Sequence, residues 1–187
     1  MNINVTSTIT PETMAITRRG IFRPTDVMAT VILGKFLGDK ISLCWLYELP
    51  NEVAPNIIVY DIGVGLLNGN KLGEKERREN NIAYSTAGLV WRRYGHSLVQ
   101  KYDKPYYVWD VVDEDLIQGI DSQSNISVIN HGTPVTEPIN LNYLINGLNI
   151  KAAFEDNEDE VFKEAVNLFE VIFDTVFNFA EYKRISF

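Results

Sequence analysis

The chain has 187 residues, of which 45% are hydrophobic, so it is long enough for one domain with a well-buried core and too short for two full domains. Its formal net charge of −8 argues against general, sequence-blind binding to nucleic acid, which depends on a positive field. The single cysteine, Cys44, lies in an apolar run and is expected to be buried and inert. The sequence has neither a leader-like start nor a run approaching ~18 apolar residues, which predicts a cytoplasmic protein with no membrane segment.

The first third of the chain predicts strands around one buried helix. Two β-prone runs are separated by Thr10, Pro11 and Glu12, which favours a β-hairpin extension over residues 1–17. A third segment is apolar almost all round and ends at Gly38, as a buried helix would. The predicted elements are strands at 3–7, 14–17, 41–46 and 57–60 and a helix at 26–37.

The remainder predicts helices. They are expected at 85–94, ending at Gly95, at 108–119, at 141–148 behind Asn140, and at 158–182. The last one carries an apolar stripe at i, i+3, i+4, i+7 spacing over more than four turns, which favours a core helix or the contact of a homodimer. The acidic run 155–160 before it is typical of a solvated N-terminal turn. The whole chain, 1–187, is expected to be a single domain of α/β class, with a mainly parallel sheet flanked by helices.

Asp61 is the most informative single residue. It follows the buried strand predicted at 57–60, and a carboxylate at the carboxyl end of such a strand faces the crevice where α/β sheets bind ligands. Gly63 and Gly65 in the next loop let the backbone approach a substrate closely. A metal or phosphate site is therefore expected at this position.

Three segments resemble, in order and spacing, the MYG1-type proteins, which are relatives of the DHH phosphoesterases. They are YDIGVG at 60–65, RRENNIAYSTAGLVWRRYG at 77–95 and VVDEDLIQGIDSQSNI at 111–126. The resemblance runs from about Thr17 to Tyr182 and implies a DHH-phosphoesterase-like α/β domain. Larger members of the family continue into a second domain.

The residues that resemble the family's metal motifs are largely replaced. The Asp-His-His triplet of the relatives falls on Asn68, Gly69 and Asn70. A further motif of the relatives aligns with residues 17–26. Its two histidines fall on Arg18 and Arg23, and its first acid falls on Thr25. The resemblance implies that carboxylates and histidines hold Mn²⁺ or Mg²⁺. The residual catalytic candidates are therefore only Asp26, Asp61 and Asp121, with Asp61 and Asp121 as metal ligands if any metal is held.

Fixed cations in place of neutral ligands change what the pocket favours. A unit charge ~4 Å from a metal opposes it by several kcal/mol at an effective dielectric near 20. Guanidinium groups suit phosphate, so the pocket is predicted to bind RNA or nucleotide phosphate. The candidate contacts are Arg18, Arg19, Arg23, Asn68, Asn70, Arg92, Arg93 and His96. The competing interpretation is a structural ion-pair cluster in which Arg18, Arg23, Asp26, Asp61 and Asp121 neutralise one another.

Three functional hypotheses from different classes remain open. The first is a catalytically inactive binding module that contacts RNA or protein. The second is a divergent 3′–5′ ribonuclease, which would use one Mg²⁺ on Asp26, Asp61 and Asp121 or cleave without a metal through arginine and histidine. The third is an anti-defence protein of the anti-CRISPR type, whose partner would be a ribonucleoprotein such as a Cas effector with its guide RNA.

Overall fold

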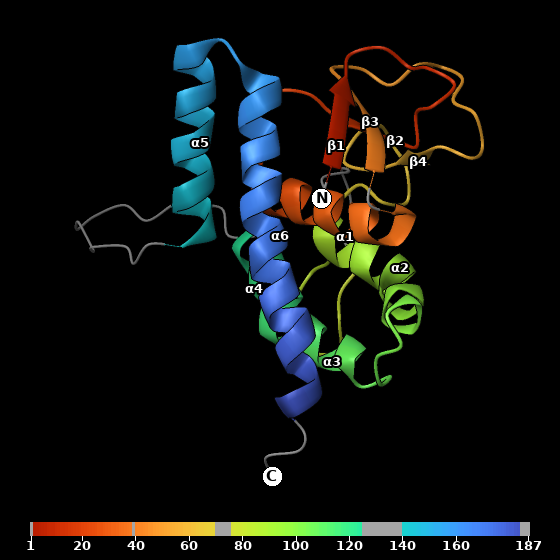
Figure 1. The fold of residues 1–187 in the computed structure, drawn as a ribbon, viewed down its shortest axis with the longest axis vertical. Helices are drawn as coiled ribbons and strands as arrows, with labels where there is room; N and C mark the ends of the chain where they lie inside the picture. Colours follow the sequence, from red (N-terminus) through yellow and green to blue (C-terminus); the bar gives the residue numbers. More distant parts are fainter. Residues whose placement is uncertain (1, 39, 70–75, 125–139, 184–187) are drawn as a thin grey trace.

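A four-stranded parallel sheet forms one end of the molecule (Figure 1). The computed structural model describes residues 2–38, 40–69, 76–124 and 140–183. The strands are β1 (Asn2–Thr6), β2 (Ala15–Arg18), β3 (Lys40–Leu46) and β4 (Ile58–Val59), in the order β1-β3-β2-β4. The predicted α/β class and parallel sheet are confirmed.

The predicted N-terminal hairpin over residues 1–17 is wrong. β3 lies between β1 and β2, and both pair with it in parallel. The stagger makes this arrangement possible, because Thr6 at the end of β1 lies opposite Cys44, while Ala15 at the start of β2 lies opposite Leu43. The segment between β1 and β2 therefore only has to pass from one side of β3 to the other, and the chain keeps its direction. Thr10, Pro11 and Glu12 do form a turn, closed by the Thr13 N–H on the Thr10 carbonyl at 3.0 Å, within this crossing.

The two faces of the sheet are covered differently. Alternate residues of β3 such as Leu43 and Trp45 belong to the large core shared with the helices. Cys44 faces the other way and packs with Ile16 and Ile62 in a small cluster under loop residues. The prediction that Cys44 is buried is confirmed.

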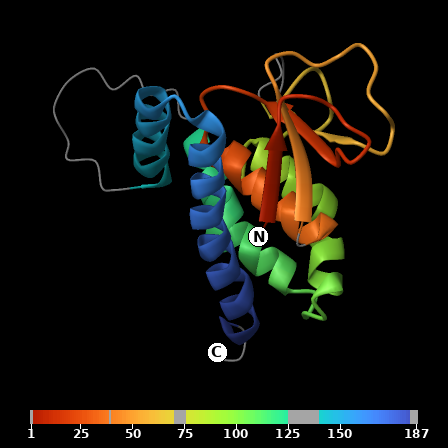
Figure 2. The same cartoon turned by 45° about the horizontal axis from the view of Figure 1, so that its top comes forward.

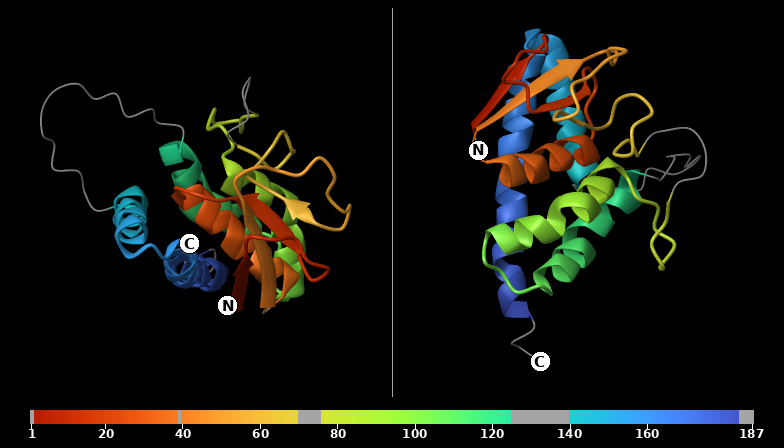
Figure 3. Two further views of the ribbon diagram at one scale, coloured as in Figure 1. Left: turned by 90° about the horizontal axis from the view of Figure 1, so that it is seen from above. Right: turned by 90° about the vertical axis from the view of Figure 1, so that its right-hand side faces the viewer.

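Helices cover one face of the sheet in successive tiers (Figures 2 and 3). α1 (Pro24–Leu37) packs on β3, and α2 (Thr86–Lys101) packs on α1. α1 is buried nearly all round and stops at Gly38, whose φ of 131° suits glycine, as predicted. Behind α2 runs a continuous helical segment made of α3 (Val108–Val112), the π-helical turn η1 (Asp113–Ile117) and α4 (Gln118–Ser124).

α2 does not end at Gly95, in contrast to the prediction. It runs on to Lys101, and Gly95 lies inside it against the indoles of Trp91 and Trp109, where a Cβ would come within 2.8 Å of either ring. The glycine is therefore there for close packing and not as a helix stop. His96 consequently lies within the helix.

α5 (Leu141–Glu155) and α6 (Glu158–Lys183) form a long helical pair along the molecule (Figures 1 and 3). Asn140 caps α5 as predicted, accepting from the Tyr143 N–H at 3.0 Å, but α5 runs past Leu148. α6 matches the predicted long helix and buries its stripe against α1 and α3, and the Phe162 ring packs at a tilt on Trp45, with the ring centroids 4.6 Å apart. In the described part of the chain, no helix is long and apolar enough to cross a membrane.

The outer face of α6 is also apolar. Val171, Phe179 and Tyr182 are each more than 60% exposed, and they recur at near-helical spacing with Leu168. Pairing of two copies through α6 stays a prediction. We expect a dimer in solution that Phe179→Glu converts to monomer, because the charge would have to be buried.

Light scattering coupled to size-exclusion chromatography measures this directly. Asn178→Glu is the control, since it adds the same charge beside the stripe and removes no apolar group. A monomeric wild-type protein would contradict the dimer.

Candidate functional site

Two arginines and two aspartates meet at the carboxyl ends of the strands. β2 ends at Arg18, and β4 leads through Tyr60 to Asp61. α1 starts at the same edge, with Arg23 as its N-cap and Asp26 in its first turn. Arg18, Arg23, Asp26 and Asp61 are called here the arginine–aspartate cluster.

Arg23 is the centre of the cluster. Its Nη2 lies 2.7 Å from Asp26 Oδ1 and 2.7 Å from Asp61 Oδ1, so one guanidinium nitrogen bridges both acids. Asp26 also accepts from the Arg23 backbone N–H at 3.0 Å, which closes a capping box at the start of α1. The same contacts therefore order the helix start and neutralise the acids.

Arg18 is held more loosely. Its Nε lies 3.4 Å from Asp61 Oδ2, its Nη2 lies 4.0 Å from Asp26 Oδ2, and its side chain is 41% exposed. Asp61 is almost fully buried, at φ 55°, and also accepts from the Thr86 hydroxyl at 3.1 Å. The left-handed backbone is one that aspartate tolerates better than most residues.

Burial dominates the protonation of this cluster. Desolvation, and then the nearby charge of Asp61, raise the pKa of Asp26 to about 7 although Arg23 acts in the opposite direction. Burial works against the charge of Arg23 too, but the two carboxylates outweigh it and raise the pKa of its guanidinium.

Asp121 lies in a second cluster. It is fully buried on α4 and pairs with Arg78, whose Nη1 is 2.6 Å away. Arg78 also forms a two-pronged contact with Asp113, at 2.7 and 2.9 Å, and stacks over Tyr84 at 4.1 Å. Arg78, Asp113 and Asp121 are called here the Arg78 cluster.

The Asp121 carboxylate occupies the N-terminus of α2. Its Oδ1 accepts from the backbone N–H groups of Ser85 and Gly88, both at 3.2 Å, and from the Ser85 hydroxyl. An anion is favoured there by the helix dipole and by otherwise unpaired N–H groups. Burial nevertheless raises the pKa of Asp121, against the contacts with Ser85 and Arg78.

The two clusters adjoin through hydroxyl groups. Thr25 lies 2.6 Å from the Ser85 hydroxyl and accepts from the Ala87 N–H at 2.8 Å. Thr86 contacts Asp61 on the other side. Thr25 stands where the resemblance to the family's motif places an acid, and here its hydroxyl forms a neutral link between α1 and α2.

The residues do not fit a metal. Among the residues that the structure describes, no three His, Cys, Asp or Glu side chains are arranged to hold an ion. The Arg23 guanidinium lies between Asp26 and Asp61, where a shared cation would have to be. Asp121 is engaged by Arg78 and α2 instead.

Two other predicted contacts, Arg19 and Asn68, are engaged with protein groups outside the cluster. Arg19 turns toward α6, 3.1 Å from Glu158, and lies over Trp45 at 5.6 Å. Asn68 is buried and donates to the Gly63 carbonyl at 2.6 Å, so its amide orders the loop. Asn70 falls outside the described residues.

The α2 candidates lie away from the cluster. Arg92 pairs with Glu76 at 2.5 Å, and Arg93 is exposed beside it. His96 stacks between Tyr106 and Trp109, at 4.7 and 4.5 Å, so its ring contacts the α3 side of the helix.

An open pocket of about 370 Å³ lies over the arginine–aspartate cluster. It is lined by Arg18, Arg23, Tyr47, Asp61, Ile62, Gly63 and Asn68. Tyr47, which is 68% exposed, was missed by sequence reasoning. Its position directly after β3, at the same edge as Arg18, is the signal that could have found it.

A family model described as an uncharacterised protein family, UPF0160, and labelled MYG1 exonuclease matches residues 15–185. The chain belongs to this MYG1 family. No curated protein and no solved structure gives a significant match. Membership suggests a metal-dependent, phosphoesterase-like function for the family.

Gly88 tests the packing of Asp121 on α2. A Cβ at Gly88 would overlap the Asp121 carboxylate, so Gly88→Ala should lower the free energy of unfolding by about 1–3 kcal/mol. Gly147→Ala in α5 is the matched control, because nothing lies within 4 Å of its Cβ position, and it should stabilise by about 0.5–1 kcal/mol. Chemical denaturation of both variants measures the difference. Equal effects would contradict the contact.

Asp26 should make stability depend on pH. Because its pKa rises from 3.8 to about 7 on folding, the native state binds more protons between these values. Its contribution to stability is therefore fully present below about pH 4 and is lost as the pH rises through about 7.

Asp26→Asn should flatten that decline, as measured by denaturation across the same pH range. Asp103→Asn, at an exposed turn, should keep the wild-type pH dependence. A wild-type slope in Asp26→Asn would show that another group is responsible.

Proposed function

We propose that this MYG1-family chain is a phosphate-reading RNA-binding module that works without a metal centre on a DHH-phosphoesterase-like scaffold. The single observation that carries the proposal is the Arg23 guanidinium bridging Asp26 and Asp61, at 2.7 Å from each. With two arginines and two aspartates, the cluster is neutral when both acids are ionised. A divalent ion added beside it would meet two fixed cations.

Arg18 supports a role in binding an anion. Its contacts with the two acids are long, and 41% of its side chain is exposed toward the pocket. A guanidinium with unused donors forms short, charge-assisted bonds to phosphate oxygens. The exposed Tyr47 ring beside it offers a surface on which a base can stack.

The overall charge limits what kind of RNA complex is expected. At −8, the chain lacks the positive field that binds RNA along its whole backbone. One or two local phosphate contacts suit an RNA end, or an RNA already held in a ribonucleoprotein. A Cas effector with its guide RNA is such a particle, and inhibiting it is the anti-defence role that we propose for this protein.

Binding and integrity of labelled RNA test the proposal together. The purified protein is mixed with single-stranded guide-type RNA, free or bound to a Cas nuclease, in Mg²⁺, in Mn²⁺ and in EDTA. We expect retention of intact RNA in all three conditions. Metal-dependent shortening that Asp61→Asn abolishes would overturn the metal-free function and restore a one-metal ribonuclease.

Arg18→Gln locates the contact. Losing one charge-assisted bond should weaken RNA retention about tenfold and lower the salt slope by about one. Arg18→Lys should recover part of the loss, because it keeps the charge without the planar fork. Lys40→Gln, at the opposite end of β3, is the matched control and should bind as the wild type does. Unchanged retention by Arg18→Gln would sink the proposal.

A further inference from the structure

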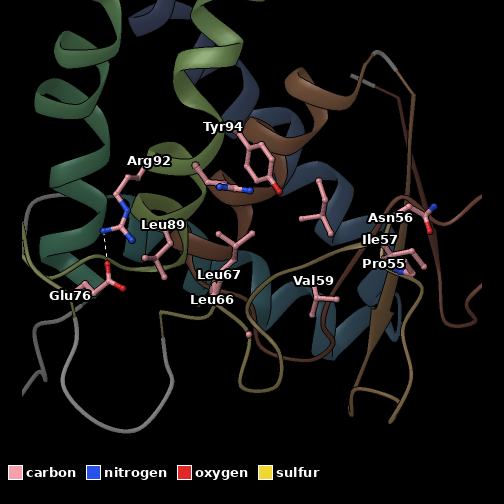
Figure 4. Close-up of a pocket in the computed structure, with 13 residues that line it drawn as sticks. Pro55, Asn56, Ile57, Val59, Leu66, Leu67, Glu76, Leu89, Arg92 and Tyr94 are labelled. Atoms are coloured by element: carbon pink, nitrogen blue, oxygen red, sulfur yellow. Dashed lines mark ion pairs between the residues drawn. The ribbon is translucent and has the colours of Figure 1, made fainter.

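A second and larger hollow lies at the outer edge of the sheet, between β4 and α2 (Figure 4). Its volume is about 660 Å³, within the usual range of ligand pockets. It is called here the β4–α2 groove, and its principal residues are Val59, Leu66, Leu67, Leu89, Arg93 and Tyr94. The loop 61–69 separates it from the arginine–aspartate cluster, since Gly63 and Asn68 line one pocket and Gly65 and Leu66 line the other.

The floor of the groove is aliphatic and comes from three elements. Val59 belongs to β4, Leu66 and Leu67 to the loop, and Leu89 to α2. Leu66, which lines the groove, is 83% exposed, so its apolar side chain has a large unfavourable contact with water. A flat apolar group laid on this floor would remove that contact.

The rim supplies one uncommitted positive charge. Arg92 is engaged, since it pairs with Glu76 at 2.5 Å and lies over Tyr84 at 4.7 Å. Arg93 is exposed, and its guanidinium has no ion pair or hydrogen bond within the described part of the chain. The ring of Tyr94 packs on Phe36 at 4.7 Å, and no described residue bonds to its hydroxyl.

The edge of β4 adds a backbone donor and acceptor. The N–H groups of Ile58 and Tyr60 both turn inward, to the carbonyls of Met14 and Ile16 at 3.0 Å. Because successive residues of a strand alternate, Val59 turns its own N–H and C=O to the outer edge, where it lines the groove. Leu67 bridges to Tyr60 in parallel and lies against the Val59 carbonyl, which has a second lone pair for another donor. The N–H donor and this remaining acceptor position match the adenine edge, which presents a ring nitrogen acceptor next to the N6 amino donor.

We propose that the β4–α2 groove binds an adenosine 5′-phosphate unit. Adenine lies on the aliphatic floor with its amino edge on the Val59 backbone, and the phosphate pairs with Arg93. The unit is either a free nucleotide or one residue of an RNA strand. The proposal stands on residues other than Arg18 and Arg23 and does not require the function proposed above.

Calorimetric titration of the full chain tests the site with defined probes. They are adenosine monophosphate, adenosine, ribose 5-phosphate and a 5′-phosphorylated oligoadenylate of three residues. We expect adenosine monophosphate to bind at least tenfold more tightly than adenosine and than ribose 5-phosphate. Arg93→Gln and Leu66→Asp, both at exposed positions, should each weaken it at least tenfold. Arg77→Gln, an exposed arginine outside the groove, is the matched control.

Each outcome decides a part of the proposal. Absence of binding by both phosphorylated adenosine probes overturns it, as does binding that neither groove variant weakens. Equal affinity for adenosine overturns the role of Arg93, and equal affinity for ribose 5-phosphate overturns the base contact. Tighter binding of the oligoadenylate than of the mononucleotide identifies RNA as the source. Because the Arg18→Gln assay measures RNA retention and this one measures a mononucleotide, the two proposals can fail separately.

Discussion

The bridge from Arg23 to Asp26 and Asp61 is the interaction on which the strand-end region depends. Asp26 and Asp61 are only 5% and 3% exposed, and two adjacent buried acids repel each other unless a cation lies between them. The bridge also orders the start of α1 through the capping box, and Asp61 reaches Thr86 at the start of α2. Removing one partner from such a pair typically costs about 3–5 kcal/mol, because it leaves an uncompensated buried charge. The cluster therefore has a structural role first, and a ligand there could use only the donors that the bridge does not engage, such as those of Arg18.

Asp121 shows why the proposed phosphate contact falls to arginine. The N-terminus of a helix is a ready anion site, but at α2 the N–H groups of Ser85 and Gly88 already bind the carboxylate of Asp121. The glycine at 88 admits that carboxylate so closely that a side chain would overlap it. An incoming phosphate cannot use this dipole without displacing a buried acid from Arg78. The two partly exposed guanidinium groups of the pocket are left as its donors.

Sequence reasoning succeeded where a signal is local. The all-round apolar pattern identified α1, the long stripe identified α6, and Asn140 identified the start of α5. The strand end located Asp61, and the resemblance to the family's motifs grouped it with Arg18, Arg23 and Asp26, which the structure brings together. The same predicted ion-pair cluster included Asp121, which is wrong, because Asp121 pairs with Arg78. Sequence reasoning failed where a residue serves a distant partner. Gly95 looks like a helix stop but is required by Trp109, and Arg78, the partner of Asp121, comes from a loop 43 residues away. The strand order was also hidden, because only the stagger against β3 shows that β1 and β2 do not pair.

The sign of the pH dependence would separate the proposed arginine site from a metal site. Carboxylate ligands must be ionised to hold a metal, so a metal site loses affinity as the pH falls. In the arginine–aspartate cluster, the protonation of Asp26 near pH 7 removes one negative charge, while Arg18 and Arg23 keep their positive charges. The cluster changes from neutral to a charge of +1, and Arg18 loses one of its two competing acids. A phosphate bound as proposed would therefore gain affinity as the pH falls through this range, and proton and phosphate uptake would be coupled in the direction opposite to that of metal binding.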